Sequence, residues 1–205
     1  MEADGLSLRL TVISNNIGYN GLLKTSWGFS CLVEGTEKTI LFDTLLLENM
    51  RLLHKDTGVV DVVVLSHIHA DHTGGVEAFL RRNSHVDVFV PASFPISLRR
   101  AIASFGAHVR VVEDSIELFD RCYSSGEMGY GIIEQALILR SRKGLVIITG
   151  CAHPGIVDVV KEAREMFQDE VYLAMGGFHL SGTSDYKIGE IARALTISWM
   201  VVLAL

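Results

Sequence analysis

The sequence is poor in cysteine, in positive charge and in long apolar segments. Three cysteines, an odd number at wide spacing, do not suggest a disulfide framework, so we expect a protein of the reducing cytoplasm. Acidic residues outnumber lysine and arginine by 24 to 18, and the net charge of −6 argues against a nucleic-acid partner. The acidic N-terminus lacks the apolar core of a secretory signal. The apolar segment 194–205 is shorter than the roughly 20 residues that span a bilayer, so no membrane partner is expected.

Enough apolar sequence is present for a packed core. Hydrophobic residues make up 49% of the chain and charged residues 20%, which is typical of a folded globular protein. The length suits a single domain over residues 1–205. We expect the apolar end of the chain to belong to this core, or to be a core element that is cut short.

The hydrophobic pattern predicts alternating strands and helices over most of the chain, which favours a layered α/β arrangement. Residues 116–130 show no clear pattern, apart from a loop expected at 124–129. Strands are predicted at residues 6–13, 27–34, 39–43, 59–65, 86–90, 109–112, 132–139, 144–149 and 171–175. Helices are predicted at residues 45–54, 76–82, 95–105, 156–167 and 185–195.

Four potential metal ligands lie close together directly after the predicted strand 59–65. In an extended chain His67, His69 and Asp71 share one side, because side chains alternate with a period of two. His72 then points the other way unless the chain turns, and the Thr-Gly-Gly at 73–75 suits such a turn. A solvated loop with accidental histidines is the alternative. Three histidines and an aspartate behind a buried strand favour a metal pocket, since neutral imidazole is the commonest metal ligand.

Other chemically active side chains also follow predicted strands. Asp43, Cys151, His153 and His179 each stand at such a strand end, where loops aim side chains while the sheet stays rigid. Taken singly, each has an ordinary alternative: a turn aspartate, a small buried thiol, a loop histidine and a core histidine. Their shared position favours one common site. The histidines without this context are expected to be surface or structural residues; they are His54, His85 and His108.

The string His-Ile-His-Ala-Asp-His at 67–72 resembles the His-x-His-x-Asp-His signature of the metallo-β-lactamase superfamily. Residues 41–44 (Leu-Phe-Asp-Thr) resemble its Phe-Asp-Thr-Gly element, with Leu45 where glycine is usual. The order of elements agrees from about residue 6 to about residue 195. The resemblance implies a four-layer αββα sandwich that is short at its C-terminus.

A narrower resemblance is carried by residues 149–155 (Thr-Gly-Cys-Ala-His-Pro-Gly) and 176–180 (Gly-Gly-Phe-His-Leu). These segments are similar to the subgroup around the dihydropterin–ribofuranosylaminobenzene 5′-phosphate synthases. That subgroup implies pterin or phosphate-ester chemistry rather than β-lactam hydrolysis. Its members continue to a further His-Cys-Thr-Gly-like segment, which this chain lacks before Leu205. We therefore expect a chain that is truncated, frameshifted or naturally short.

The superfamily resemblance implies a centre with two divalent ions. One ion is expected at His67, His69 and His153, and the second at Asp71 and His72. Zinc suits these ligands best, with iron and manganese as rivals.

Three residues complete the implied centre. Cys151 stands where the superfamily usually has a bridging aspartate, so it is either a thiolate ligand or a bystander. His179 is expected to complete the second ion. Asp43 is expected to fix a ligating imidazole through a hydrogen bond.

The first functional hypothesis is a metal-dependent hydrolase or group-transfer enzyme acting on a small, phosphorylated or pterin-related substrate. A metal-bound hydroxide would attack, and Asp71 would orient it. The second hypothesis is a metal-binding but catalytically incomplete protein or fragment that needs a partner, with self-association through the apolar tail from Ala194. A nuclease is disfavoured by the acidity, and a redox enzyme by the lack of a flavin-binding region.

Overall fold

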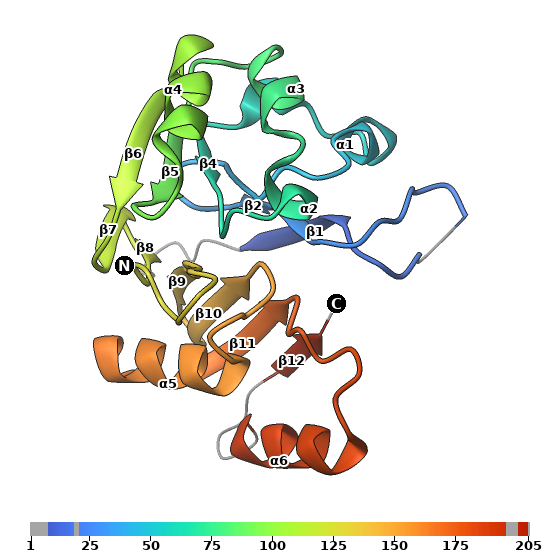
Figure 1. Ribbon diagram of the computed structural model, residues 1–205, viewed down its shortest axis with the longest axis vertical. Helices are drawn as coiled ribbons and strands as arrows, with labels where there is room; N and C mark the ends of the chain where they lie inside the picture. Colours follow the sequence, from blue (N-terminus) through green and yellow to red (C-terminus); the bar gives the residue numbers. More distant parts are fainter. Residues whose placement is uncertain (1–7, 19–20, 196–200, 205) are drawn as a thin grey trace, which may run out of the picture.

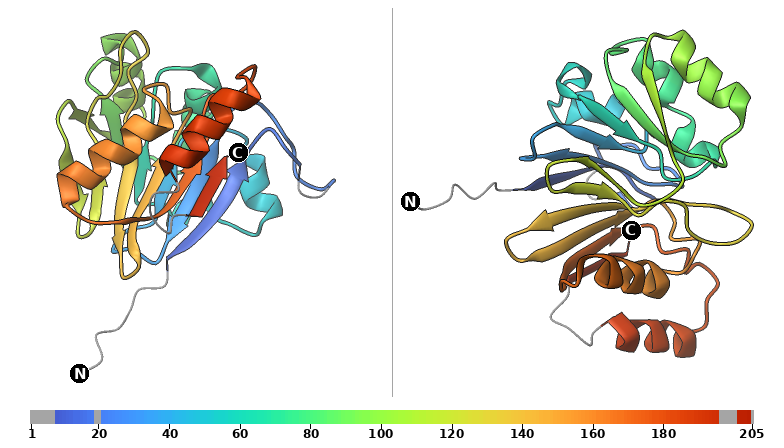
Figure 2. Two further views of the ribbon diagram at one scale, coloured as in Figure 1. Left: turned by 90° about the horizontal axis from the view of Figure 1, so that it is seen from below. Right: turned by 90° about the vertical axis from the view of Figure 1, so that its left-hand side faces the viewer.

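The computed structural model describes residues 8–18, 21–195 and 201–204. Two six-stranded sheets lie face to face, and helices cover the outer face of each (Figure 1). The views in Figure 2 show the same helix–sheet–sheet–helix order from two further sides. The predicted αββα arrangement is thereby confirmed.

The first sheet joins an antiparallel hairpin region to a parallel region. β1, β2 and β3 pair antiparallel, whereas β3 to β6 pair parallel. The strands follow the sequence in order across the sheet: β1 (Arg9–Ser14), β2 (Ser30–Glu34), β3 (Ile40–Phe42), β4 (Val62–Val64), β5 (Asp87–Pro91) and β6 (His108–Val112).

Short helices cover the outer face of this sheet (Figure 1). In β4, Val63 packs toward the helices, while Val62 and Val64 pack toward the second sheet. Both faces of the strand are therefore buried, which explains why its sequence is continuously apolar rather than alternating. The elements of this layer are α1 (Glu48–Leu52), the 3-10 turn η1 (Thr57–Val59), α2 (Ala70–Thr73), α3 (Val76–Leu80) and α4 (Ile96–Ser104).

The second sheet has the order β12-β11-β10-β9-β8-β7, and β10, β11 and β12 run parallel. α5 (Ile156–Phe167) connects β10 to β11 and buries Ile156, Val159 and Ala163 against the sheet. α6 (Asp185–Leu195) lies beside α5 in the same layer (Figure 2). The strands are β7 (Ile116–Phe119), β8 (Cys122–Ser124), β9 (Leu137–Ser141), β10 (Gly144–Thr149), β11 (Val171–Gly176) and β12 (Val201–Ala204).

Several predicted boundaries differ from the structure. The strand expected at 132–139 begins only at Leu137, because Glu134 and Gln135 use their side chains to bind neighbouring loops. The segment 116–130 contains β7 and β8, whose short, partly exposed strands leave little hydrophobic pattern. Residues 201–204 of the apolar end form β12 at the edge of the second sheet, and residues 196–200 and 205 lie outside the described part. Within the described residues, no helix has the length and apolar character needed to cross a membrane.

Candidate metal centre

The side chains singled out in the sequence meet at one edge of the two sheets. His67 follows β4, α2 carries His72, Cys151 and His153 follow β10, and His179 follows β11. The C-terminal ends of these parallel strands place their loops together. A cavity of about 450 Å³ opens there, lined by residues that include Asn16, Ile17, Trp27, His69, Asp71, Cys151, His153, Phe178, His179 and Leu180.

Three sets of donor atoms come close enough to hold a metal ion. Within each set, the ligand atoms lie within 4.8 Å of one another. The sets overlap, so they describe one continuous centre. They are His67, His72 and Cys151; His67, His69 and His153; and Cys151, His153 and His179. The second set is the one expected to hold the first ion.

One buried atom in this centre has no hydrogen-bond partner. Nε2 of His153 is inaccessible to solvent and unpaired among the protein atoms. A buried polar atom without a partner is costly unless it binds something else. The His153 ring centroid lies 4.7 Å from that of His67 and 5.1 Å from that of His69. The orphaned nitrogen therefore fits a metal ion, as the donor chemistry of the whole cluster does.

His72 reaches the centre because the chain turns earlier than expected. α2 begins at Ala70, and the N–H of His72 donates to the His69 carbonyl. The turn thus occurs at 70–73 rather than at the glycine pair. Gly75 has a different reason to be glycine, since a Cβ there would lie 1.5 Å from the Thr44 carbonyl oxygen.

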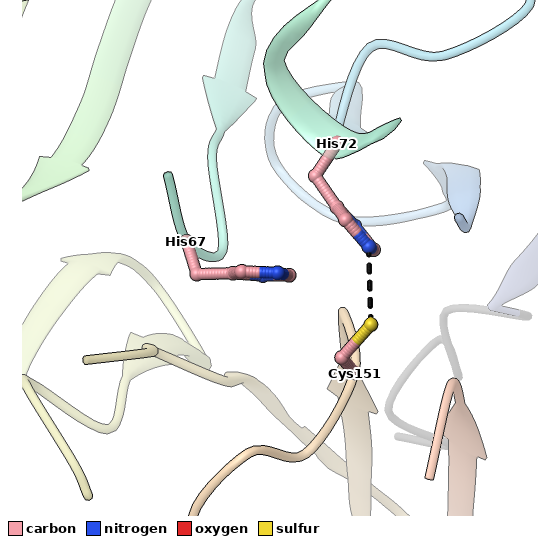
Figure 3. A group of neighbouring side chains, drawn as sticks. All are labelled: His67, His72 and Cys151. Carbon is pink, nitrogen blue, oxygen red and sulfur yellow. Dashed lines mark hydrogen bonds between the residues drawn. The ribbon is translucent and has the colours of Figure 1, made fainter. Parts of the chain in front are cut away.

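Figure 3 shows how the two sheets meet across the centre. His67 and His72 extend from the first sheet's side, and Cys151 extends toward them from the second. Cys151 Sγ lies 3.2 Å from Nε2 of His72. A thiolate at this position is a soft donor that suits zinc as well as imidazole does.

Asp43 ties two histidines of the first sheet together. The side chain is completely buried, and its Oδ2 lies 2.7 Å from His72 Nδ1 and 2.7 Å from Ser66 Oγ. Its Oδ1 accepts the Ser66 N–H at 2.7 Å. Since a carboxylate only accepts, the Ser66 hydroxyl donates to it and can accept from His67 Nδ1, 2.9 Å away. Both histidines then present Nε2 toward the centre.

The Asp43 contact also favours a cation beside His72. Burial by itself disfavours a charged imidazole at His72. The charge and hydrogen bond of Asp43, helped by Cys151, nevertheless raise the pKa of His72 to about 10. The same field that holds a proton on this ring favours a metal ion in its place.

Two other imidazoles of the centre are held neutral. Burial first, and then the neighbouring histidines, lower the pKa of His67 to about 2. The same two causes lower the pKa of His153 to about 4. Neutral imidazole is the form that binds metals.

Glu134 is a residue of the site that the sequence reasoning missed. It is 2% exposed, and its carboxylate accepts the backbone N–H groups of the loop 150–153. Burial raises the pKa of Glu134, while the N–H groups that it accepts act in the opposite direction. The available signal was a Glu-Gln pair inside an otherwise apolar predicted strand.

Asp71 and His179 lie at the rim of the centre. Asp71 Oδ2 is 3.6 Å from His72 Nε2, but Asp71 belongs to none of the three donor sets found in the described residues. His179 is exposed, and its ring centroid lies 4.7 Å from that of His153. The structure brings both residues to the cavity. The histidines expected to be surface or structural residues are exposed: His54, His85 and His108.

Two facing sheets with a histidine-rich centre at their shared edge are typical of one large superfamily of metal-binding proteins. The family model of the metallo-beta-lactamase superfamily matches residues 28–162 of the sequence. The chain belongs to this superfamily. This fold implies binding of divalent metal.

Among relatives, a 7,8-dihydropterin-6-methyl-4-(beta-D-ribofuranosyl)-aminobenzene-5'-phosphate synthase of Methanocaldococcus jannaschii is 28% identical over 239 residues. The match covers 90% of this chain and 81% of that protein. An uncharacterized protein of the same organism is 28% identical over 220 residues, covering 89% of this chain and 83% of its own length. The resemblance to the synthase subgroup is thereby confirmed.

Solved structures show the same fold. The crystal structure of Tm1679, a metal-dependent hydrolase of the beta-lactamase superfamily, superposes with a TM-score of 0.78 at 26% identity. The superposition covers 97% of this chain and 87% of the Tm1679 chain. The short form of human tRNase Z gives a TM-score of 0.63 at 13% identity. The superposition covers 96% of this chain and 95% of that chain, and it shows the fold alone. Superfamily membership, the synthase relative and Tm1679 together support a metal-dependent enzyme.

Proposed function

We propose that the protein is a metal-dependent hydrolase or group-transfer enzyme that acts on a small, phosphorylated or pterin-related molecule. The observation that carries the proposal is the meeting of imidazole and thiol donors at one cavity, with the Nε2 of His153 unpaired. The relative named as a pterin-related phosphate synthase supports the substrate class. The relative named as a metal-dependent hydrolase supports the reaction class.

The donor sets suggest which residues would hold two divalent ions. His67, His69 and His153 would hold one, and His72 with Cys151 would hold the other. Histidine and thiolate donors favour zinc, with iron and manganese as rivals. Such ions, when bound, supply Lewis acidity and lower the pKa of water.

Asp71 is placed to handle a proton beside these donors. Its side chain is 37% exposed, and it lines the cavity rather than the core. Its carboxylate can therefore accept a hydrogen bond from a nucleophile in the cavity and orient it. We assign Asp71 this role, and His179 lines the same cavity.

The cavity wall fits a flat or apolar group better than a charged one. Trp27 is 68% exposed and Ile17 is 70% exposed at its rim, and Phe178 and Leu180 also contribute. An aromatic wall can stack on a heterocyclic ring. No lysine or arginine lines the cavity within the described residues. A phosphate group on the substrate would therefore depend on the metal centre for positive charge.

The test combines metal analysis with kinetics. Purified protein should contain stoichiometric divalent metal and should turn over a chromogenic phosphodiester or a phosphorylated pterin. His69→Ala and Asp71→Ala should lose this activity, and His85→Ala, which changes an exposed histidine, should retain it. Protein without stoichiometric metal, or unchanged activity in the first two variants, would contradict the proposal.

A further inference from the structure

One buried carboxylate accepts four consecutive backbone N–H groups at the second sheet's side of the centre. Oε1 of Glu134 accepts from Gly150 at 2.8 Å, from Cys151 at 3.0 Å and from Ala152 at 3.1 Å. Its Oε2 accepts from His153 at 2.9 Å. Four N–H donors on one buried carboxylate favour its ionised form, and hydrogen bonds to an ionised acceptor in a low-dielectric setting are strong.

The loop adopts an unusual backbone to reach this carboxylate. Ala152 lies between the two ligand-bearing residues and has a φ of 52°, in the left-handed region that residues with a side chain seldom occupy. A run of N–H groups that curls around one anion is a nest. The anion here belongs to the protein itself, so Glu134 fixes the course of the loop and not merely one contact.

This loop supplies a ligand to every donor set. Cys151 belongs to two of the three sets and His153 belongs to two of them, and no set found in the described residues lacks both. The position of this loop relative to the first sheet therefore decides whether the donors meet.

The next residue in the chain binds the other half of the centre. Gln135 Nε2 donates to the Leu65 carbonyl at 2.9 Å, and the Gln135 N–H donates to the Ser66 carbonyl at 2.9 Å. Leu65 and Ser66 directly precede His67. Ser124 Oγ holds the Gln135 side chain by donating to its Oε1 at 2.6 Å. Two adjacent residues thus contact both ligand-bearing segments.

We propose that Glu134 is the positioning residue of the metal centre, and that it sets Cys151 and His153 at ligand distance by binding their backbone. Gln135 holds this arrangement in register with His67. The proposal rests on the proposed metal-dependent function, because positions are being set for metal ligands. It does not depend on the substrate or on the reaction.

Glu134→Gln tests this most sharply, since it keeps the shape but replaces one acceptor oxygen with an N–H donor that faces the loop's N–H groups. Mutating a residue that hydrogen-bonds to a metal ligand typically lowers metal affinity by roughly 10–100-fold. We expect a loss in this range for Zn²⁺, measured by competition with a chromophoric chelator. Bound Co²⁺ should give an altered visible absorption spectrum, because its ligand geometry changes.

Asp61→Asn is the matched control. Its carboxylate also accepts a backbone N–H, from Thr39 at 2.8 Å, but it precedes β4 and so lies at the opposite end of that strand from His67. It should leave Zn²⁺ affinity and the Co²⁺ spectrum unchanged. If Glu134→Gln binds both metals as the unaltered protein does, the proposal is wrong.

A second measurement decides the matter if Glu134→Gln does not fold. In the metal-free, unaltered protein, amide hydrogen exchange should show the N–H groups of 150–153 protected to the degree of the sheet amides. Exchange as fast as in the exposed turn at Gly131 would overturn the proposal. Inactivity of the metal-loaded, unaltered protein would instead contradict the proposed function, and it would leave the affinity comparison intact.

Discussion

The two sheets supply two halves of one centre, and they do so in different ways. The first sheet contributes ligands from a single segment, 67–72, in which His67 and His69 precede the short helix α2 and His72 lies on it. The second contributes Cys151 and His153 from one loop and His179 from another. The ligands of the first half are therefore adjacent in the sequence, although Asp43, which is distant in the sequence, binds His72 directly. The second depends on how β10 and β11 are placed and on a loop held by a distant residue.

Each half depends on one buried carboxylate, but the two act on different groups. Asp43 binds the ring nitrogen of His72 and, through Ser66, that of His67. It thereby sets which nitrogen faces the centre and how strongly a cation is favoured there. Glu134 binds backbone N–H groups, so it sets where the ligands are rather than how they are protonated.

The largest expected effect comes from removing a ligand that two of the donor sets share. His67 belongs to the donor sets completed by Cys151 and by His153. His67→Ala should weaken metal binding by more than the roughly 100-fold upper range for partners of ligands. Calorimetric titration with Zn²⁺ measures this. His108→Ala, which alters an exposed histidine, should titrate like the unaltered protein, and equal affinity in both variants would contradict a shared ligand.

Asp43→Asn probes the first half alone. Loss of the carboxylate removes the charge that holds a proton on His72, so in metal-free protein the pKa of His72 should fall below its value of about 10. Metal affinity should decrease by roughly 10–100-fold. Histidine NMR titration reports the first change. An unshifted His72 resonance would show that Asp43 does not control this ring.

Gly150→Ala probes the contact between the halves. A Cβ there would lie 2.1 Å from Ser66 Oγ, so the two segments must move apart. Overpacking of this kind costs about 1–3 kcal/mol in the free energy of unfolding, which urea denaturation measures. Gly21→Ala is the control, because its Cβ would meet nothing within 4 Å. Equal losses in both variants would mean that the halves are not in close contact.

The smallest effect is a dependence of stability on pH. The folded-state pKa of His153, about 4, lies below its ordinary value of 6.5. Between these values the unfolded chain binds more protons, so the free energy of unfolding of metal-free protein should fall as the pH falls from 6.5 toward 4. His153→Asn should show a shallower decline in urea denaturation. Parallel curves for the two proteins would contradict the lowered pKa.

The comparison also explains what the sequence could predict. The buried strand and the ligand segment that follows it are contiguous, so periodicity and residue type sufficed to predict a metal site at 67–72. The second half could be predicted only from isolated residues that follow strands: Cys151, His153 and His179. Glu134 gave no motif, because its partners are backbone N–H groups that leave no trace in residue identity. The same polar pair caused the error in the strand predicted at 132–139, which begins at Leu137.

Anomalous diffraction from crystals of the zinc-loaded protein would show whether both sheets contribute ligands to one centre. We predict a zinc peak about 2.0–2.1 Å from imidazole nitrogens of His67, His69 and His153. Two of these residues belong to the first sheet's side and one to the second. Zinc bound only by residues of one sheet, or only outside the cavity, would contradict it.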